Sequence, residues 1–199
     1  MITPRPYLSY SQLVLFEKSK EAYAEKYLFG GKERITRNMA YGSAMAEGLE
    51  HDESTGDPYL DAMMVQLPKY ELMDKPLMAE LKDGKTSIPL LAKPDSAKAD
   101  YTAFYEYKTS VRPWTQRMAD KSDQITFYSA VILLKTALLP IDIELVDVCL
   151  VYDTNSRLMP TGEIVRLPTK RTMVDILKMY TRIRKAWKGI KELCENQLI

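Results

Sequence analysis

The stretch that decides the fold runs from Pro94-Asp95 to Glu106-Tyr107-Lys108-Thr109, with ten residues between the aspartate and the glutamate. Residues 103–109 are mostly aromatic or β-branched, and this composition predicts a strand. Side chains two apart in a strand point to the same face, so Glu106 and Lys108 are expected to point the same way. The stretch therefore predicts a charged patch on one face of a sheet.

A second strand is predicted over residues 87–93. If the two strands form a hairpin that turns between Asp100 and Tyr101, position 95 lies opposite position 106, because both are equally far from the turn. Directly opposed residues share a face. Two carboxylates this close repel unless a cation lies between them, and Mg²⁺ prefers carboxylate oxygens completed by water and phosphate. The spacing predicts a magnesium site whose neighbouring lysine holds or activates a water. An isolated Glu-x-Lys, in contrast, is usually a surface ion pair.

The rest of the chain supplies helices around these strands. Periodicity and capping residues predict helices over 9–29, about 40–51, 59–67 and about 118–139, further strands over 144–152 and 163–167, and an amphipathic helix from about 173 to the end. This order predicts an α/β (α+β) fold in which a small mixed β-sheet is flanked by helices. At 199 residues, the chain is expected to form a single domain, 1–199, with an N-terminal helical segment and a basic C-terminal helix.

Composition excludes several classes of site. Cys149 and Cys194 are too few for a four-cysteine cluster or a disulfide scaffold, and His51 is the only histidine. No stretch is long and apolar enough to span a bilayer, and no secretory leader is visible. We expect a cytoplasmic protein, of a bacterium or a phage-infected host, without a membrane partner.

Taken together, these residues resemble the PD-(D/E)XK nuclease superfamily. Pro94-Asp95 and Glu106-Tyr107-Lys108 match its signature, and the order of the flanking motifs resembles its RecB-like branch, including stand-alone phage-type exonucleases. The flanking motifs are Leu8-Ser9-Tyr10-Ser11-Gln12-Leu13, Gly42-Ser43, Leu49-Glu50, Thr109, and Gln124 followed four residues later by Tyr128. The resemblance implies a restriction-endonuclease-like core and a Mg²⁺- or Mn²⁺-dependent deoxyribonuclease, with exonuclease action expected, in DNA recombination, repair or processing.

The resemblance also assigns roles to individual residues. Asp95 and Glu106 would bind the metal, and the Tyr107 carbonyl would add a third oxygen. Lys108 would activate the attacking water. Gln124 and Tyr128, one helical turn apart, would hold the metal shell or the scissile phosphate.

Two departures from the family pattern affect the metal. The family's helix histidine is replaced by Ala46, so Glu47, the first choice by proximity, or Glu50 is expected to substitute as the helix ligand. Lys18-Ser19-Lys20 occupies the position where some relatives carry a cluster cysteine, so no iron–sulfur cluster is expected. The missing histidine also favours an alternative, in which the chain is a weak or inert nuclease-fold module that binds DNA or a protein.

Phosphate contacts require basic side chains. The candidates lie beside the lysine motif and on the terminal helix: Arg112, Arg117, Lys121, Arg182, Lys185 and Lys188. Trp114 is expected in the core, with base stacking as its alternative role. No sequence-reading module is present, so DNA structure or ends are the expected target. A homo-oligomer and a recombination or annealing protein are further expected partners.

Overall fold

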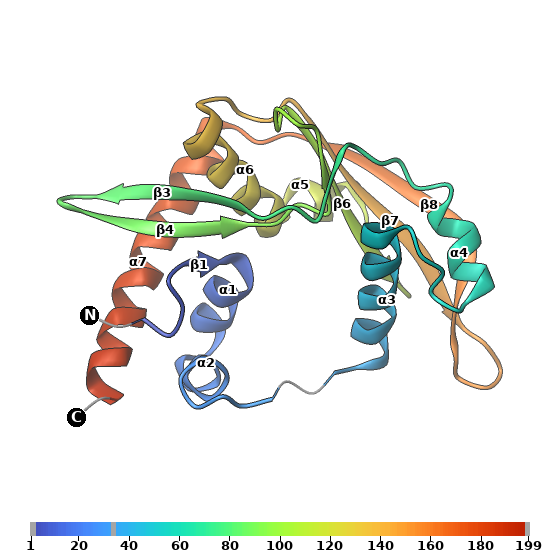
Figure 1. Cartoon of the computed structure of the whole chain (residues 1–199), viewed down its shortest axis with the longest axis horizontal. Helices are drawn as coiled ribbons and strands as arrows, with labels where there is room; N and C mark the ends of the chain where they lie inside the picture. Colours follow the sequence, from blue (N-terminus) through green and yellow to red (C-terminus); the bar gives the residue numbers. More distant parts are fainter. Residues whose placement is uncertain (1–2, 33–34, 198–199) are drawn as a thin grey trace.

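The computed structural model describes residues 3–32 and 35–197. In that part of the chain the strands form two sheets, one ordered β1-β4-β3 and the other β2-β5-β6-β7-β8. The strands are β1 (Leu8–Ser9), β2 (Leu72–Met73), β3 (Leu77–Asp83), β4 (Thr86–Ala92), β5 (Ser96–Ala97), β6 (Ala103–Ser110), β7 (Asp142–Tyr152) and β8 (Leu158–Thr169). The helices are α1 (Tyr10–Lys18), α2 (Lys20–Tyr27), α3 (Arg37–His51), α4 (Pro58–Met64), α5 (Gln116–Asp120), α6 (Asp123–Thr136) and α7 (Met173–Gln197). The predicted mixed sheet flanked by helices is confirmed (Figure 1).

The register around the deciding stretch agrees with the prediction, but the partner strand does not. β5 pairs antiparallel with β6, with Ser96 opposite Tyr105, so the same centre places position 95 opposite position 106. The strand predicted over 87–93 is instead β4, which pairs with β3 and β1 in the other sheet. A tight turn at Gly84, with φ of 61°, joins β3 to β4. β4 ends shortly before Pro94, which has no N–H to donate to a continuing ladder.

Two predicted helices are each broken by a serine. The helix predicted over 9–29 is interrupted at Ser19, which is extended (φ −161°) and accepts a hydrogen bond from the Ala22 N–H at 3.1 Å. Similarly, α5 and α6 are separate because Ser122 caps α6 by accepting from the Ile125 N–H at 3.5 Å. A serine side chain stabilises a new helix start better than a continued helix.

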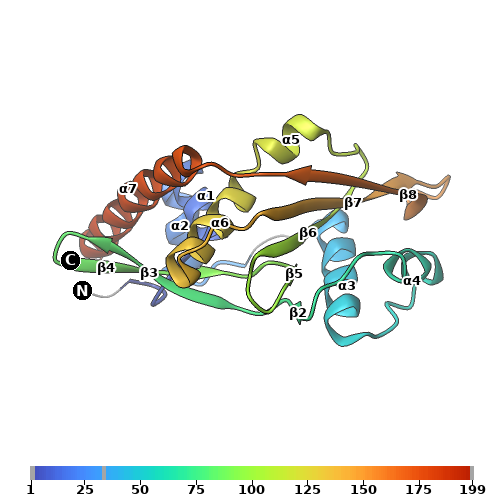
Figure 2. The ribbon, with the colours of Figure 1, turned by 90° about the horizontal axis from the view of Figure 1, so that it is seen from above.

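Helices cover the five-stranded sheet on both faces, and β7 contributes to both layers. Leu145 faces the core shared with α1, α6 and α7, whereas Val146 and Val148 face a second core shared with α3 and α4. Figures 1 and 2 show α3 and α4 toward one end of the molecule and α1, α2 and α7 toward the other. In the parallel β6–β7 ladder Glu106 lies opposite Leu145, which places the carboxylate on the α6 face of the sheet.

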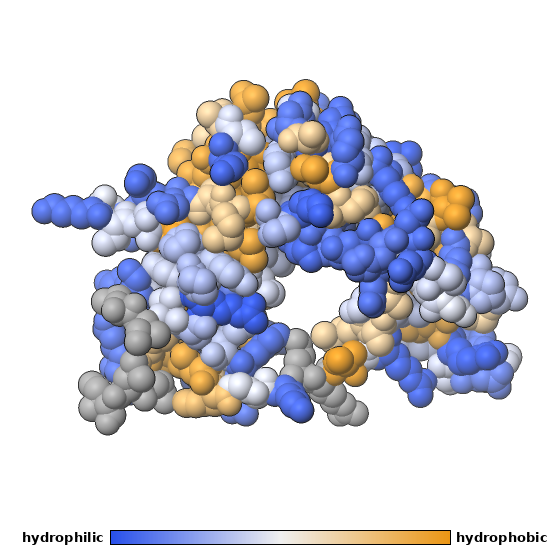
Figure 3. Space-filling view, viewed as in Figure 1, coloured by the Kyte–Doolittle hydropathy of each residue, from blue (hydrophilic) through white to orange (hydrophobic). Residues whose placement is uncertain are grey.

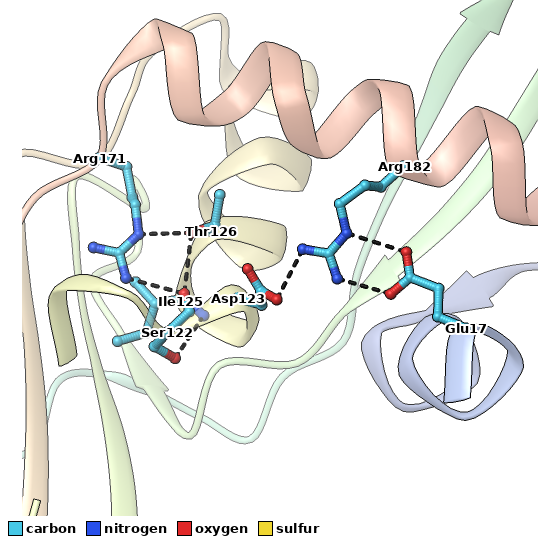
Figure 4. Close-up of polar contacts among 7 residues, drawn as sticks. All are labelled: Glu17, Ser122, Asp123, Ile125, Thr126, Arg171 and Arg182. Atoms are coloured by element: carbon cyan, nitrogen blue, oxygen red, sulfur yellow. Dashed lines mark hydrogen bonds and ion pairs between the residues drawn. The ribbon is translucent and has the colours of Figure 1, made fainter. Parts of the chain in front are cut away.

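Two arginines, Arg171 just before α7 and Arg182 on it, connect this helix to the rest of the fold (Figure 4). Arg182 makes two hydrogen bonds to the Glu17 carboxylate of α1 and an ion pair of 2.8 Å to Asp123 of α6. Arg171 is buried and donates to the Thr126 hydroxyl and to the carbonyls of Ala119 and Ser122. Among the described residues, no helix is long and apolar enough to cross a membrane.

Candidate active site

A cleft with a volume of about 490 Å³ opens where α3 meets the end of β6. One wall is α3, which presents small side chains at Gly42, Ser43 and Ala46. A Cβ at Gly42 would lie 3.2 Å from the Thr109 hydroxyl oxygen, so the glycine permits this close approach of helix and strand. Figure 3 shows the molecule hollowed at its centre, with hydrophilic side chains along the upper border of the hollow.

The carboxylates and the lysine of the deciding stretch form the base of this cleft. The Tyr107 N–H donates to Asp95 Oδ2 at 2.7 Å, which fixes the aspartate against β6. The Lys108 ammonium donates to Glu106 Oε1 at 2.5 Å. Asp95, Glu106 and Lys108 all line the cleft, as their shared face predicts.

Helix α6 contributes a polar extension to this group. Gln124 accepts from the Lys108 ammonium at 2.9 Å through Oε1 and donates to the Tyr128 hydroxyl at 3.0 Å through Nε2. The four-residue spacing puts Gln124 and Tyr128 on one face of α6, which makes this chain of hydrogen bonds possible. Lys108 is thereby held from two sides.

Burial and mutual repulsion set the charges in the cleft. Burial and then the Glu106 charge raise the pKa of Asp95 well above its usual range. Burial also raises the pKa of Glu106, although the Lys108 ammonium opposes the shift. For Lys108 itself, burial favours the neutral amine, but the charges of Glu106 and Asp95 outweigh burial and raise its pKa. A cation between the two carboxylates would relieve their repulsion.

The donor atoms suit a divalent cation. Glu106 is 1% exposed, and its second oxygen, Oε2, is buried without a hydrogen-bond partner. A buried carboxylate oxygen with no partner is unfavourable unless an ion or water completes it. No group of three or more His, Cys, Asp or Glu side chains placed to hold a metal occurs in residues 3–32 and 35–197. The carboxylate oxygens of Asp95 and Glu106 are donors of the kind that a hard divalent cation prefers, with water completing its shell.

The α3 wall differs from the pattern that the sequence predicted. Ala46 lines the cleft, but Glu47 is exposed and does not belong to its lining. Glu50 lies one turn further along α3, near Asp74. Burial and then the Glu50 carboxylate raise the pKa of Asp74, while Lys93 opposes them. Neither predicted helix ligand lines the cleft, and Glu50 is the one that lies near Asp74.

Asp74 is a site residue that sequence reasoning missed. Its N–H donates to the Asp95 carbonyl at 2.9 Å, and its carboxylate forms an ion pair with Lys93. Its backbone is left-handed, with φ of 49°, at the end of the short strand β2. No spacing relates it to the Asp95 motif, because it reaches the site only through the pairing of β2 with β5.

A buried aspartate on the neighbouring strand was also missed. Asp147 of β7 is 0% exposed, lies opposite Lys108 in the ladder, and accepts from the Ser110 hydroxyl at 2.6 Å and the Trp114 N–H at 2.9 Å. Burial raises its pKa, and the Ser110 hydrogen bond opposes the shift. It ties the segment after β6 to the sheet. Trp114 itself packs, half-buried, against the main core, as expected for its structural role.

The predicted DNA-contacting residues are spread over two regions. Arg112, Arg117 and Lys121 are exposed on the segment between β6 and α6, and Lys185 and Lys188 are exposed on α7, beside the end of β3. Arg182 is committed to Glu17 and Asp123, so its guanidinium serves the packing of α7 (Figure 4).

Comparisons with known proteins place the fold. No family model matches the sequence, and no curated protein matches it. The chain is similar in structure to a candidate exonuclease from Eubacterium rectale, with a TM-score of 0.60 and 11% identity, over 96% of this chain and 82% of that one. It also aligns with an alkaline exonuclease, LHK-Exo, from Laribacter hongkongensis, with a TM-score of 0.48 and 15% identity, over 96% and 92% of the two chains. At these identities the likeness to the first structure shows a shared fold.

Proposed function

We propose that this protein is a divalent-metal-dependent deoxyribonuclease of the PD-(D/E)XK type, most similar to the RecB-like branch, and that it acts as an exonuclease. The observation that carries the proposal is the convergence of Asp95, Glu106 and Lys108 in one cleft, with a buried Glu106 oxygen that has no partner. The substrate class follows from the resemblance of these motifs, and the fold shared with a candidate exonuclease supports it.

Asp95, Glu106 and the Tyr107 carbonyl would hold Mg²⁺ or Mn²⁺. The bound ion would supply Lewis-acid polarisation of a phosphate oxygen and a water of lowered pKa. Lys108 would orient the attacking water and offset negative charge on the phosphate in the transition state. Gln124 would fix the lysine, and Tyr128 would fix the glutamine.

A second candidate function is a binding module of the same fold with weak or no activity. Ala46 favours it, because this position lines the cleft without offering a ligand. The charges at the base of the cleft favour catalysis, since a module that only binds DNA has no need to bury the Glu106 carboxylate beside a half-buried aspartate and lysine.

The proposal is tested by incubating the purified protein with end-labelled linear, nicked and circular DNA in Mg²⁺, Mn²⁺ or chelator. An exonuclease should shorten the linear DNA in metal and leave the closed circle intact. Cutting of the circle would make the protein an endonuclease. Absence of cleavage on every substrate, with DNA binding retained, would favour the binding module.

A further inference from the structure

Asp147 carries a second buried carboxylate oxygen without a hydrogen-bond partner in the part of the chain that the structure describes. Its Oδ2 accepts two hydrogen bonds, from Ser110 and Trp114, but Oδ1 is buried and has no partner. The hydrogen bonds that hold the Ser110–Trp114 segment therefore account for only one of the two carboxylate oxygens of Asp147. An unpaired carboxylate oxygen in the interior is unfavourable unless a partner reaches it in some state of the protein.

The adjacent strand β6 carries a candidate donor for this oxygen. Asp147 and Lys108 are opposed in the parallel β6–β7 ladder, and opposed residues project from the same face of a sheet. A lysine ammonium has three donors on a flexible stem. Hydrogen bonds to Glu106 Oε1 and Gln124 Oε1 account for two of them.

Lys108 shares the Glu106 carboxylate that a divalent cation would use. Its ammonium lies 2.5 Å from Glu106 Oε1, whereas Oε2 has no hydrogen-bond partner among the described residues, so a cation at Oε2 would place a second positive charge on the carboxylate that holds the ammonium. The ammonium, whose side chain is 25% exposed, would then lie beside a like charge. A partly buried ammonium beside a like charge is destabilised unless another acceptor offsets the repulsion.

We propose that Asp147 is a positioning residue that receives the Lys108 ammonium when a divalent cation binds Glu106. This inference rests on the proposed metal-dependent function. The exchange of partners accounts for both orphaned oxygens, because Glu106 Oε2 is completed by the cation and Asp147 Oδ1 by the ammonium. The lysine remains anchored to Gln124 during the exchange, so it stays beside the water that it would activate.

Calorimetric titration of the DNA-free protein with MnCl₂ tests this exchange without any catalytic readout. Asp147→Asn should weaken Mn²⁺ binding about tenfold, the usual size of a supporting-residue effect on metal affinity. Asp142→Asn, the same substitution at an exposed position of β7, is the matched control and should bind like the wild type.

A double-mutant cycle separates this role from general damage to the site. In a Lys108→Met background there is no ammonium to receive, so Asp147→Asn should no longer change Mn²⁺ affinity. Equal weakening in both backgrounds, or wild-type affinity of Asp147→Asn, would overturn the exchange. Glu106→Gln should abolish binding. A wild type that binds no Mn²⁺ would overturn the proposed function together with this inference. If Glu106→Gln abolishes Mn²⁺ binding but Asp147→Asn leaves it unchanged, only this inference is overturned.

If Asp147→Asn does not fold, judged by its circular dichroism and thermal unfolding, the wild type still decides. A crystal structure of the Mn²⁺-loaded wild type should place Lys108 Nζ within hydrogen-bond distance of Asp147 Oδ1 and away from Glu106. An ammonium that stays on Glu106 in that structure would overturn the proposal.

Discussion

Lys108 connects three parts of the site. It lies between Glu106 and Gln124 and opposite Asp147. Replacing it with methionine keeps the aliphatic stem and removes the charge. We expect Lys108→Met to lower the cleavage rate about a thousandfold, since the activation of water is lost, while DNA affinity changes little. Gel-based cleavage and fluorescence anisotropy measure the two quantities.

The exposed Lys85→Met, in the β3–β4 turn, is the matched control for this change and should cleave like the wild type. Parallel loss of cleavage and of DNA binding in Lys108→Met would contradict its assigned role, because it would make the lysine a phosphate contact.

Tyr128 contacts Lys108 only through Gln124. Its hydroxyl accepts from Gln124, which in turn holds Lys108. Tyr128→Phe keeps the packed ring and removes this acceptor, so we expect about a tenfold loss in cleavage rate, typical of a residue that orients a site residue. Tyr180→Phe, which removes a buried hydroxyl distant from Gln124, is a suitable comparison. Equal effects of the two changes would indicate a loss of stability alone.

At the level of single residues, the sequence predicts that side chains lie together only when they share a strand or a helix turn. Glu106 and Lys108 are two apart, and Gln124 and Tyr128 are four apart, so local geometry is sufficient to group them. Asp74 and Asp147 reach the site through strand pairings that no local pattern encodes. They could therefore not be found before the fold was known.

Among the secondary-structure elements, α7 begins with a reciprocal cap. The Thr172 N–H and hydroxyl donate to Asp175 Oδ2 at 2.8 and 2.7 Å, and the Asp175 N–H donates back to the Thr172 hydroxyl at 3.3 Å. These hydrogen bonds hold the pKa of Asp175 below its ordinary value. We expect Asp175→Asn to lower the free energy of unfolding by about 1 kcal/mol at neutral pH.

The pH dependence of this loss has a definite sign. A carboxylate whose pKa is lower in the folded state stabilises the fold fully above its unfolded pKa of about 4. That stabilisation disappears as the pH falls through the folded pKa. Urea unfolding of wild type and Asp175→Asn should therefore converge in acid, with Glu192→Gln near the other end of α7 as control. A difference that is the same at acidic and neutral pH would contradict an ionic cap.

Arg182 joins three helices and provides a second test at the scale of elements. Because the guanidinium is partly exposed, its pairs with Glu17 and Asp123 are expected to contribute about 1 kcal/mol to stability. Arg182→Ala should lower the free energy of unfolding by that amount while leaving DNA affinity close to the wild-type value. A large loss of DNA affinity without a loss of stability would instead indicate that Arg182 contacts DNA, as the sequence predicted.

Sequence patterns predicted the secondary-structure elements better than the residues at which they begin and end. Hydrophobic periodicity continues through Ser19 and Ser122, so one long helix is predicted at each place. In the fold each serine caps a new helix start. The turn centre between β5 and β6 was predictable from spacing, but the pairing of β4 with β3 depended on a strand, residues 77–83, that the pattern did not reveal.

At the scale of the whole molecule, positive charge on α7 lies apart from the cleft. Lys185 and Lys188 are exposed beside the end of β3, and neither lines the cleft. If DNA extends from the cleft across α7, Lys185→Ala combined with Lys188→Ala should weaken binding. The slope of log affinity against log salt should then fall by about 1.5.

Anisotropy titrations at several salt concentrations measure this slope. Lys75→Ala combined with Lys135→Ala, two exposed lysines outside the α7 and β3–β4 surface, is the matched control. An unchanged slope in the α7 variant would move the DNA path to the segment that carries Arg112, Arg117 and Lys121.

We propose that the cleft between α3 and β6 hydrolyses DNA with a metal held by Asp95 and Glu106. The most direct measurement is Mn²⁺-dependent cleavage of end-labelled linear DNA by the wild type and by Glu106→Gln, which keeps the shape of the side chain and removes its charge. We expect the wild type to degrade the DNA only with metal, and Glu106→Gln to leave it intact while still binding it. Equal cleavage by the two proteins would contradict a role of Glu106 in metal-dependent hydrolysis.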